Sequence, residues 1–199
     1  LAKQKNIETG RIIGIYPETK HPTYFQSINL ALEEPLVDIL HKNGYVSSDV
    51  PIFIQSFEVD NLQQLKKMTN LPLIQLLDDK NMQPYDFVVK DDSRTYGDLT
   101  SLQELAKIAE YAEGIGAYKG LIVPIGVDIN STTLITDAHA VNLKIHAWTF
   151  RNEEQYLAPN YQGNPQTEYE QFFKLGIDGV FSDFPDLAVT ICNRMFSNY

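Results

Sequence analysis

The chain has 199 residues, of which 43% are hydrophobic, and a formal net charge of −10 at pH 7. This length supports one sizeable hydrophobic core rather than two, and the acidic balance gives no electrostatic footprint for nucleic acid or for anionic membranes. Because Cys192 is the only cysteine, an internal disulfide and a cysteine-built zinc site are both excluded, and the thiol is expected to be packed.

Short segments rich in Ile, Leu, Val and aromatic residues alternate with helical patterns along the chain. The predicted strands, in chain order, are Arg11–Lys20, Pro51–Glu58, Leu71–Leu77, Leu143–Arg151 and Gly179–Phe184, with a weaker sixth at Gly120–Pro124. Helices are predicted in residues 26–43 (interrupted), 60–69, 101–112, 131–142 and 167–175. The helix that begins at Ser101 carries a capping-box pattern completed by Glu104. Strands that alternate with helices predict βα units and a parallel sheet.

Polar residues gather where the strands end, which favours a TIM-type (β/α) barrel over a doubly wound sheet. A closed barrel has eight strands and about 250 residues, so five strong strands leave about three βα units unaccounted for. We therefore expect residues 1–199 to be the C-terminal portion of one barrel domain, with about 130 residues upstream. Such a piece alone would expose sheet edges and its apolar interior, so we expect it to be poorly soluble or molten unless it is part of a longer or self-associated object.

Two long loops, residues 78–98 and 152–167, follow predicted strands. They therefore lie at the rim where barrel active sites are built. Two interpretations stay open: solvated decoration, or a lid that determines specificity.

Glu18 and Lys20 end the first predicted strand and share one face with Tyr16. A carboxylate at this place is a ligand for a hard cation, and an ammonium beside it can hold a phosphate. The alternative is an ordinary ion pair at a strand end.

Other strand ends carry polar and aromatic groups as well. Gln55 and Phe57 share a face, as do His146, Trp148 and Phe150, and the last strand ends in Ser182, Asp183 and Phe184. This pattern is typical of a concave site with a few polar groups in an aromatic lining.

The histidines point less clearly to chemistry. His146 would lie deeper than Trp148, so a packed histidine is favoured over a general base. By alternation His21 should point away from Glu18 and Lys20, as a structural residue. His41 and His139 are expected to face solvent.

Four blocks, IYPETKHP, PIFIQSFE, LKIHAWTFRNE and LGIDGVFSDFPDLAV, resemble the glycerophosphodiester phosphodiesterase family, specifically its longer bacterial, periplasmic type. The resemblance implies a TIM barrel that hydrolyses glycerophosphodiesters to glycerol 3-phosphate and an alcohol with a divalent metal, Ca²⁺ in preference to Mg²⁺. It implies that Glu18 is a metal ligand, that Lys20 contacts the substrate phosphate and that Trp148 lines the glycerol side. Gln55, Phe57 and Phe184 are predicted pocket walls. A periplasmic or secreted location is expected, with a cytoplasmic one as the alternative.

No His-Arg-Gly motif is present in this chain, and we expect the chain to lack the family's Glu-x-Asp metal pair and its second catalytic histidine as well. We therefore expect no catalytic acid or base in this chain and predict that the 199 residues alone are inactive. One carboxylate does not hold a hard divalent cation, because such an ion needs several oxygen ligands. The expected partner is a small-molecule diester, with no nucleic acid and no stable membrane insertion.

Three other functions remain open from the sequence. The first is a non-catalytic barrel module that binds phosphate esters. The second is an enzyme in which Lys20 forms a Schiff base. The third is a phospholipase-like member of the same fold that acts on lysolipids or sphingolipids.

Overall fold

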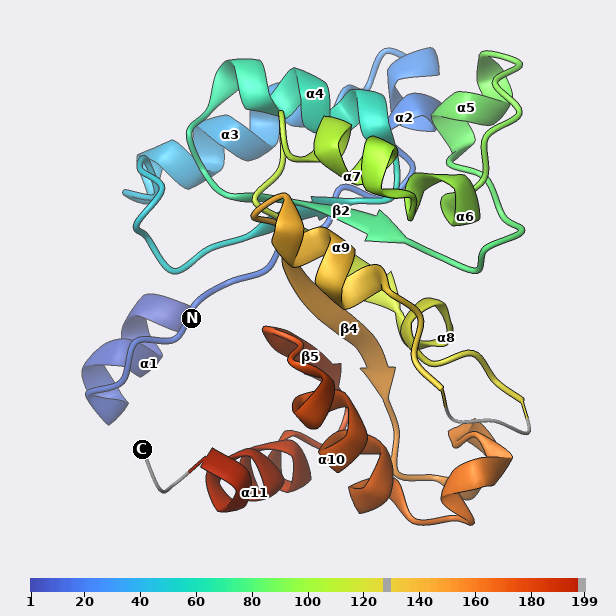
Figure 1. The fold of residues 1–199 in the computed structure, drawn as a ribbon. Helices are drawn as coiled ribbons and strands as arrows, with labels where there is room; N and C mark the ends of the chain where they lie inside the picture. Colours follow the sequence, from blue (N-terminus) through green and yellow to red (C-terminus); the bar gives the residue numbers. More distant parts are fainter. Residues whose placement is uncertain (127–129, 197–199) are drawn as a thin grey trace.

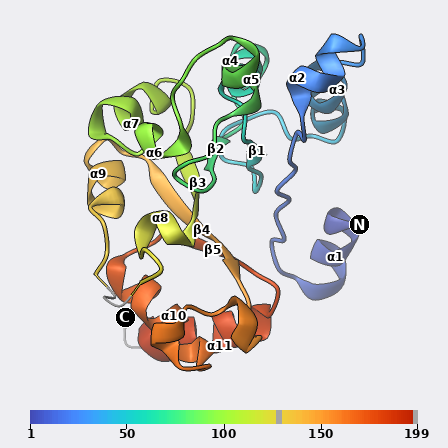
Figure 2. The same cartoon turned by 90° about the vertical axis from the view of Figure 1, so that its right-hand side faces the viewer.

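The computed structural model describes residues 1–126 and 130–196, which form one curved parallel sheet with helices along its outer side (Figures 1 and 2). The sheet has the order β1-β2-β3-β4-β5, so each strand pairs with the next strand in sequence. Its strands are β1 (Ile54–Ser56), β2 (Leu73–Leu77), β3 (Gly114–Tyr118), β4 (Lys144–Phe150) and β5 (Gly179–Ser182). All four pairings are parallel, which confirms the predicted βα organisation and an incomplete (β/α) barrel.

Eleven α-helices and two 3₁₀ turns occupy the described ranges. They are α1 (Ala2–Thr9), α2 (Pro22–Ser27), α3 (Glu33–Lys42), α4 (Val59–Met68), α5 (Tyr85–Val89), α6 (Tyr96–Leu99), α7 (Leu102–Ile108), α8 (Lys119–Ile122), α9 (Leu134–Ala140), η1 (Glu154–Tyr156), η2 (Pro159–Tyr161), α10 (Pro165–Leu175) and α11 (Pro185–Phe196). The predicted helices correspond to α2 with α3, and to α4, α7, α9 and α10. Two helices at the ends of the chain, α1 and α11, were not predicted. Both long loops also contain short helices rather than simple coil.

The first predicted strand is present as an interrupted ladder beside β1. Ile15 and Glu18 form parallel bridges with Ile52 and Gln55. The N–H of Thr19 donates to the Gln55 carbonyl at 3.1 Å. Pro17 has no N–H, so the ladder lacks one bond and no continuous strand forms. The segment nevertheless extends the sheet, because it pairs in parallel alongside β1.

The predicted strand at Gly120–Pro124 is wrong. The strand is Gly114–Tyr118, and residues 119–122 instead form α8. A Cβ at Gly116 would lie 2.5 Å from Leu76 Cδ2, and one at Gly114 would lie 2.7 Å from the Lys144 carbonyl oxygen. Close packing therefore requires glycines here, and these glycines weaken the hydrophobic pattern that identifies other strands.

The capping box predicted at Ser101 is also wrong. Ser101 precedes α7 but makes no side-chain cap, because its hydroxyl donates to the Asp98 carbonyl at 2.9 Å. The capping box belongs to α6, where Thr95 and Asp98 exchange side-chain and backbone hydrogen bonds. The Glu104 carboxylate instead pairs with Arg94 at 2.8 Å.

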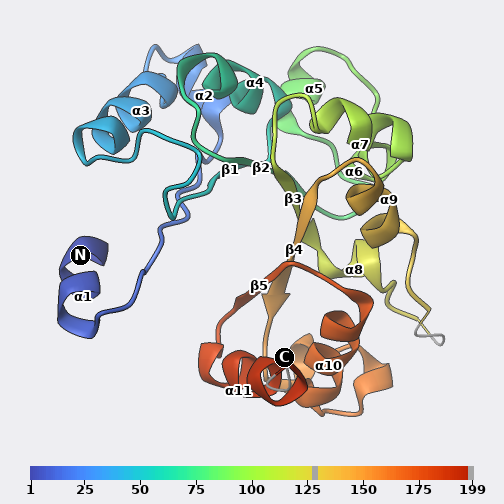
Figure 3. The same cartoon turned by 60° about the vertical axis from the view of Figure 1, so that its left-hand side comes forward.

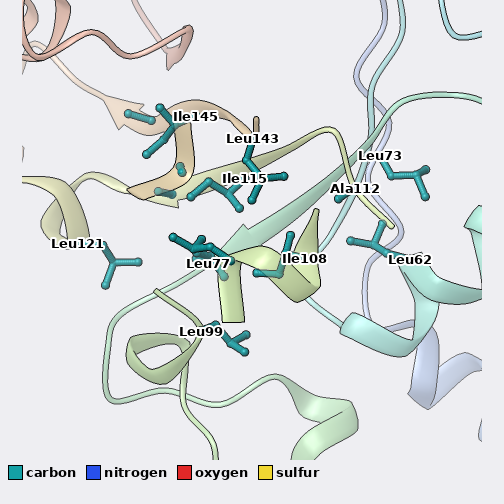
Figure 4. Close-up of a cluster of buried hydrophobic side chains, with 14 of the residues drawn as sticks. Leu62, Leu73, Leu77, Leu99, Ile108, Ala112, Ile115, Leu121, Leu143 and Ile145 are labelled. Atoms are coloured by element: carbon teal, nitrogen blue, oxygen red, sulfur yellow. The ribbon is translucent and has the colours of Figure 1, made fainter. Parts of the chain in front are cut away.

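The core lies between the sheet and its helices. Figure 4 shows Leu62, Ile108 and Leu121 from the helices beside Leu77, Ile115 and Ile145 from the strands.

The two ends of the chain are less buried than this core. The helix α1 has no buried residue and lies apart from the other helices (Figure 3), and every residue of β5 is half-buried. None of the described helices is long and apolar enough to span a bilayer.

Candidate functional site

A cavity of about 380 Å³ opens where the bridged segment, β1 and β2 end. Glu18, Lys20 and His21 line one part of it, and Phe57, Asp78 and Tyr96 line another. Parallel strands bring their carboxyl ends to one edge of the sheet, which is why residues far apart in sequence meet here. The cavity lies at the edge where barrel sites are expected.

Glu18 has an oxygen to which none of the described residues donates a hydrogen bond. Its Oε1 is buried without a hydrogen-bond partner, and so is the Oε1 of Gln55, its partner in the parallel bridge. Burial raises the pKa of the Glu18 carboxyl, while the charges of Lys20 and His21 act in the opposite direction. Buried oxygens without donors are rare in folded proteins, so this pair is suited to a cation or to a ligand that donates hydrogen bonds.

A buried polar network holds Thr19, which lies between Glu18 and Lys20. The Thr19 hydroxyl donates to Asn61 Oδ1 at 2.6 Å, and Asn61 Nδ2 donates to Glu33 Oε1 at 2.6 Å. Gln26 Nε2 donates to the same Glu33 oxygen at 2.6 Å. Because side chains alternate along an extended segment, anchoring Thr19 on the helix side directs its neighbours to the cavity side.

The prediction that His21 points away from this pair is wrong, because the extended segment ends before it. His21 has a left-handed backbone with φ of 53° and is the residue from which α2 begins. It therefore lines the same cavity as Glu18 and Lys20. Strand alternation does not apply to a residue that has left the strand.

Trp148 contributes to an aromatic wall next to the cavity. Its Nε1 donates to the Gly116 carbonyl at 2.8 Å, and its ring lies 5.8 Å from Phe57 and 5.5 Å from Tyr118, measured between centroids. Phe57 also lines the cavity, so Trp148 connects to it through one ring contact. Phe184 follows β5 and is half-buried, and Gln55 is buried in β1; neither of these two predicted walls is among the residues that line this cavity.

The structure favours the packed interpretation of His146. Its side chain is 7% exposed, and its Nδ1 lies 2.8 Å from the Tyr16 hydroxyl. Burial lowers the pKa of the His146 imidazole, which keeps the ring neutral. Tyr16 in turn packs against Phe53 and Phe181. Tyr16, Phe53, His146 and Phe181 thus form one cluster of contacting rings.

The remaining histidines and the cysteine are structural or peripheral. His139 is exposed and pairs with Asp178 at 2.9 Å. His41 is half-buried rather than solvent-facing, and its Nε2 lies 3.0 Å from the Thr69 hydroxyl. Cys192 is a free, half-buried thiol on α11.

The described residues fit one side of a site for a hard cation but not a complete one. Within residues 1–126 and 130–196 no group of three His, Cys, Asp or Glu side chains could hold a metal ion. Glu18 and Gln55 supply the unsatisfied oxygens. Since Ca²⁺ takes six to eight oxygen ligands, the other ligands of such a site would have to come from elsewhere.

The expectation that the chain lacks a Glu-x-Asp pattern is wrong, because Glu58 and Asp60 form one. Glu58 is 2% exposed, and its Oε2 accepts the Thr23 N–H at 2.9 Å. Asp60 lies in the first turn of α4 and pairs with Lys90. The two carboxylates thus have separate structural partners, and they do not form the expected metal pair.

Comparison with known proteins places these features in context. The model of the glycerophosphoryl diester phosphodiesterase family matches residues 1–187. Over 89% of its length the chain is 36% identical to the glycerophosphodiester phosphodiesterase GDPD6 of Arabidopsis thaliana, and over 91% it is 26% identical to a glycerophosphodiester phosphodiesterase of Haemophilus influenzae. The chain covers 50% and 53% of these two proteins, so it spans about half the length of the curated relatives it matches.

The solved structures show the same fold. A crystal structure of a putative glycerophosphoryl diester phosphodiesterase from Silicibacter pomeroyi superposes with a TM-score of 0.65. The match covers 96% of this chain and 54% of that chain at 14% identity. This likeness supports the fold and, at such low identity, does not define the site.

Proposed function

Because the chain belongs to the glycerophosphoryl diester phosphodiesterase family, we propose that the protein of which it is part hydrolyses glycerophosphodiesters to glycerol 3-phosphate and an alcohol. The observation that carries the proposal is one cavity, at the strand ends, that contains both Lys20 and a Glu18 with an unsatisfied buried oxygen. An ammonium and a metal-binding carboxylate are the groups that a negatively charged phosphodiester requires.

Each residue has a distinct part in this proposal. Lys20 binds a non-bridging oxygen of the phosphate and offsets the negative charge that develops during hydrolysis. Glu18 provides a carboxylate ligand for a divalent cation, Ca²⁺ in preference to Mg²⁺, and Gln55 adds an amide oxygen beside it. The cation would supply Lewis-acid polarisation of the phosphoryl group. Trp148 and Phe57 exclude water on the glycerol side.

The acid, the base and the remaining metal ligands belong, in this proposal, to residues upstream of Leu1. Two observations on the described residues support that arrangement: the bridged segment pairs with the β1 side of the sheet alone, and no three-ligand group is present. The 199 residues would then be the C-terminal portion of the barrel and inactive alone. Glycerol 3-phosphate release by the purified 199-residue chain in the presence of Ca²⁺ would contradict this part.

The activity is tested in the full-length protein by glycerol 3-phosphate release from glycerophosphocholine. We expect Lys20→Met to lower kcat/KM by about 100-fold or more, as expected when a charge-stabilising group is lost. Lys67→Met is the matched control, because Lys67 is an exposed lysine of α4, and it should leave kcat/KM unchanged. EDTA should remove the activity, and Ca²⁺ should restore it better than Mg²⁺. A full-length protein that is inactive under all these conditions would refute the proposal.

We also propose a bacterial, periplasmic or secreted origin, with a cytoplasmic location as the alternative. The support is the motif resemblance alone. Immunodetection after fractionation of the source cells tests it, and signal confined to the cytoplasm would contradict it.

A further inference from the structure

Charge is distributed unevenly around the cavity that contains Lys20. Lys20 and its neighbour His21 come from the bridged segment and the start of α2, beside the Glu18 carboxylate. Glu58 and Asp78, which follow β1 and β2, line the cavity as well. Among the described residues neither of these two carboxylates forms an ion pair with a lysine, arginine or histidine side chain. The cavity therefore has one part in which Lys20 lies beside Glu18 and a negative part formed by Glu58 and Asp78.

Asp78 is the more accessible of the two acids. Glu58 is 2% exposed and accepts the Thr23 N–H, so its carboxylate is less accessible to a ligand in the cavity. Asp78 is half-buried, and within residues 1–126 and 130–196 the hydrogen bond made to its side chain comes from the Asp79 N–H, at 2.7 Å to Oδ1. Its other oxygen is free to meet a ligand. Both carboxylates, with Asp86, also act to raise the pKa of the neighbouring Tyr96 hydroxyl, although burial is the larger cause.

The walls of the negative part are aromatic. Tyr96 and Phe57 meet edge to face with their centroids 6.1 Å apart, and Tyr85 and Met82 line the cavity as well. Tyr85 is 47% exposed, so part of its ring is open to a ligand. Aromatic faces attract organic cations, and a nearby carboxylate strengthens this attraction.

We propose that this cavity selects glycerophosphodiesters whose alcohol carries a positive charge, such as an amino alcohol or a quaternary ammonium alcohol. The phosphate lies at Lys20, and the cationic group lies between Asp78 and the ring of Tyr85. This inference rests on the proposed function and names the substrate class of the same site. Asp78 and Tyr85 are specificity-determining residues, whereas Lys20 serves every substrate of the class.

A neutral alcohol fits less well for a physical reason. It would leave the charge of Asp78 without compensation in a partly dehydrated cavity. An anionic alcohol would be repelled by the same carboxylate. The expected order of kcat/KM is therefore cationic, then neutral, then anionic, with about tenfold between the first two, which corresponds to about 1.4 kcal/mol.

The full-length protein provides the test. We would measure kcat/KM for glycerophosphocholine and glycerophosphoethanolamine, which carry cationic alcohols, and for glycerophosphoglycerol and glycerophosphoinositol, which carry neutral ones. Asp78→Asn should lower kcat/KM for the first pair about tenfold and leave the second pair within about twofold. Asp78→Glu, which keeps the charge, should retain most of the preference. Asp79→Asn is the matched control, because Asp79 lines a neighbouring hollow instead of this cavity.

The outcomes separate this inference from the proposed function. Hydrolysis of all four diesters at similar rates, or an equal loss for all four in Asp78→Asn, would overturn the inference and leave the activity standing. If the wild-type protein hydrolyses none of them, calorimetric binding of phosphocholine and glycerol 3-phosphate still decides the matter. Tighter binding of phosphocholine that is lost in Asp78→Asn supports the inference, and equal binding overturns it. Thermal unfolding confirms that each variant is folded.

Discussion

Two lysine–glutamate pairs lie at the carboxyl-terminal rim of the sheet, and they differ in whether the lysine and the glutamate contact each other. Lys119 begins α8 and contacts Glu168 of α10, with 2.7 Å between Nζ and Oε1. These side chains are 11% and 2% exposed, and the ammonium also lies over the ring of Phe150. Glu18 and Lys20 form no direct ion pair, and they line an open cavity.

The difference separates a structural pair from a binding pair. Burial raises the pKa of both glutamates. Lys119 opposes this effect on Glu168 through a hydrogen bond and its charge, whereas Lys20 opposes it on Glu18 through charge alone. The closed pair holds α8 against α10 beside the end of β4. Each glutamate keeps one buried oxygen without a partner among the described residues, Oε1 of Glu18 and Oε2 of Glu168, but of the two pairs the open one also leaves its ammonium for a ligand.

Breaking the closed pair should have the largest effect on stability. Lys119→Met leaves the Glu168 carboxylate buried without its cation, so we expect the free energy of unfolding to fall by about 3–5 kcal/mol. Urea denaturation measures it, with Lys174→Met, an exposed lysine of α10, as the control. A loss below about 1 kcal/mol would mean that the pair is not structural.

Neutralising a second buried carboxylate, Asp86, should raise the free energy of unfolding, whereas breaking the Lys119–Glu168 pair should lower it. Asp86 is 1% exposed and accepts the Asp60 N–H at 2.8 Å, but its Oδ1 has no partner. Burial raises its pKa to about 6 from 3.8, so the folded protein binds more protons than the unfolded chain between these values. Stability that depends on this group therefore falls as pH rises from 3.8 to about 6 and stays low above that range.

Asp86→Asn should remove that loss. We expect the variant to be more stable than the wild type by up to about 3 kcal/mol at pH 7.5 and to have nearly equal stability at pH 3.5. Urea denaturation across this pH range tests the prediction, with Asp91→Asn, an exposed acid beyond α5, as the control. A difference that does not change with pH would contradict it.

Breaking the hydrogen-bond network that holds Thr19 should lower the free energy of unfolding by a moderate amount. Asn61→Ala leaves the Thr19 hydroxyl and a buried Glu33 oxygen each short of a partner, so we expect a loss of about 2 kcal/mol in unfolding free energy. Gln63→Ala, an exposed change on α4, is the control. Equal stability of the two variants would show that the network does not hold the segment.

The open pair itself should have the smallest effect on stability. Lys20→Met removes an exposed ammonium that forms no direct ion pair, so the unfolding free energy should change by about 0.5 kcal/mol or less. The same variant is expected to lose most activity in the full-length protein. A loss comparable to that of Lys119→Met would make the two pairs equivalent and remove the distinction between them.

Several parts of this structure could be predicted from local sequence. Continuous apolar runs identified β1, β2, β4 and β5, because strands covered on both faces have few polar positions. Alternation placed Thr19 opposite Glu18 and Lys20, as the structure has it. Local sequence failed at β3, where glycines replace large side chains, and at His21, where the backbone leaves the extended conformation.

The sequence by itself determined a parallel α/β architecture, the chain order of its strands and the acid and amine that end the first extended segment. These follow from periodicity and hydrophobicity, which each segment carries locally. Only the tertiary structure decided which polar groups meet: Lys119 contacts Glu168, Thr19 donates to Asn61, and Glu18 makes no direct contact with Lys20. The reason is that burial and pairing depend on residues distant in the chain, and no local pattern specifies the partner that the fold brings near.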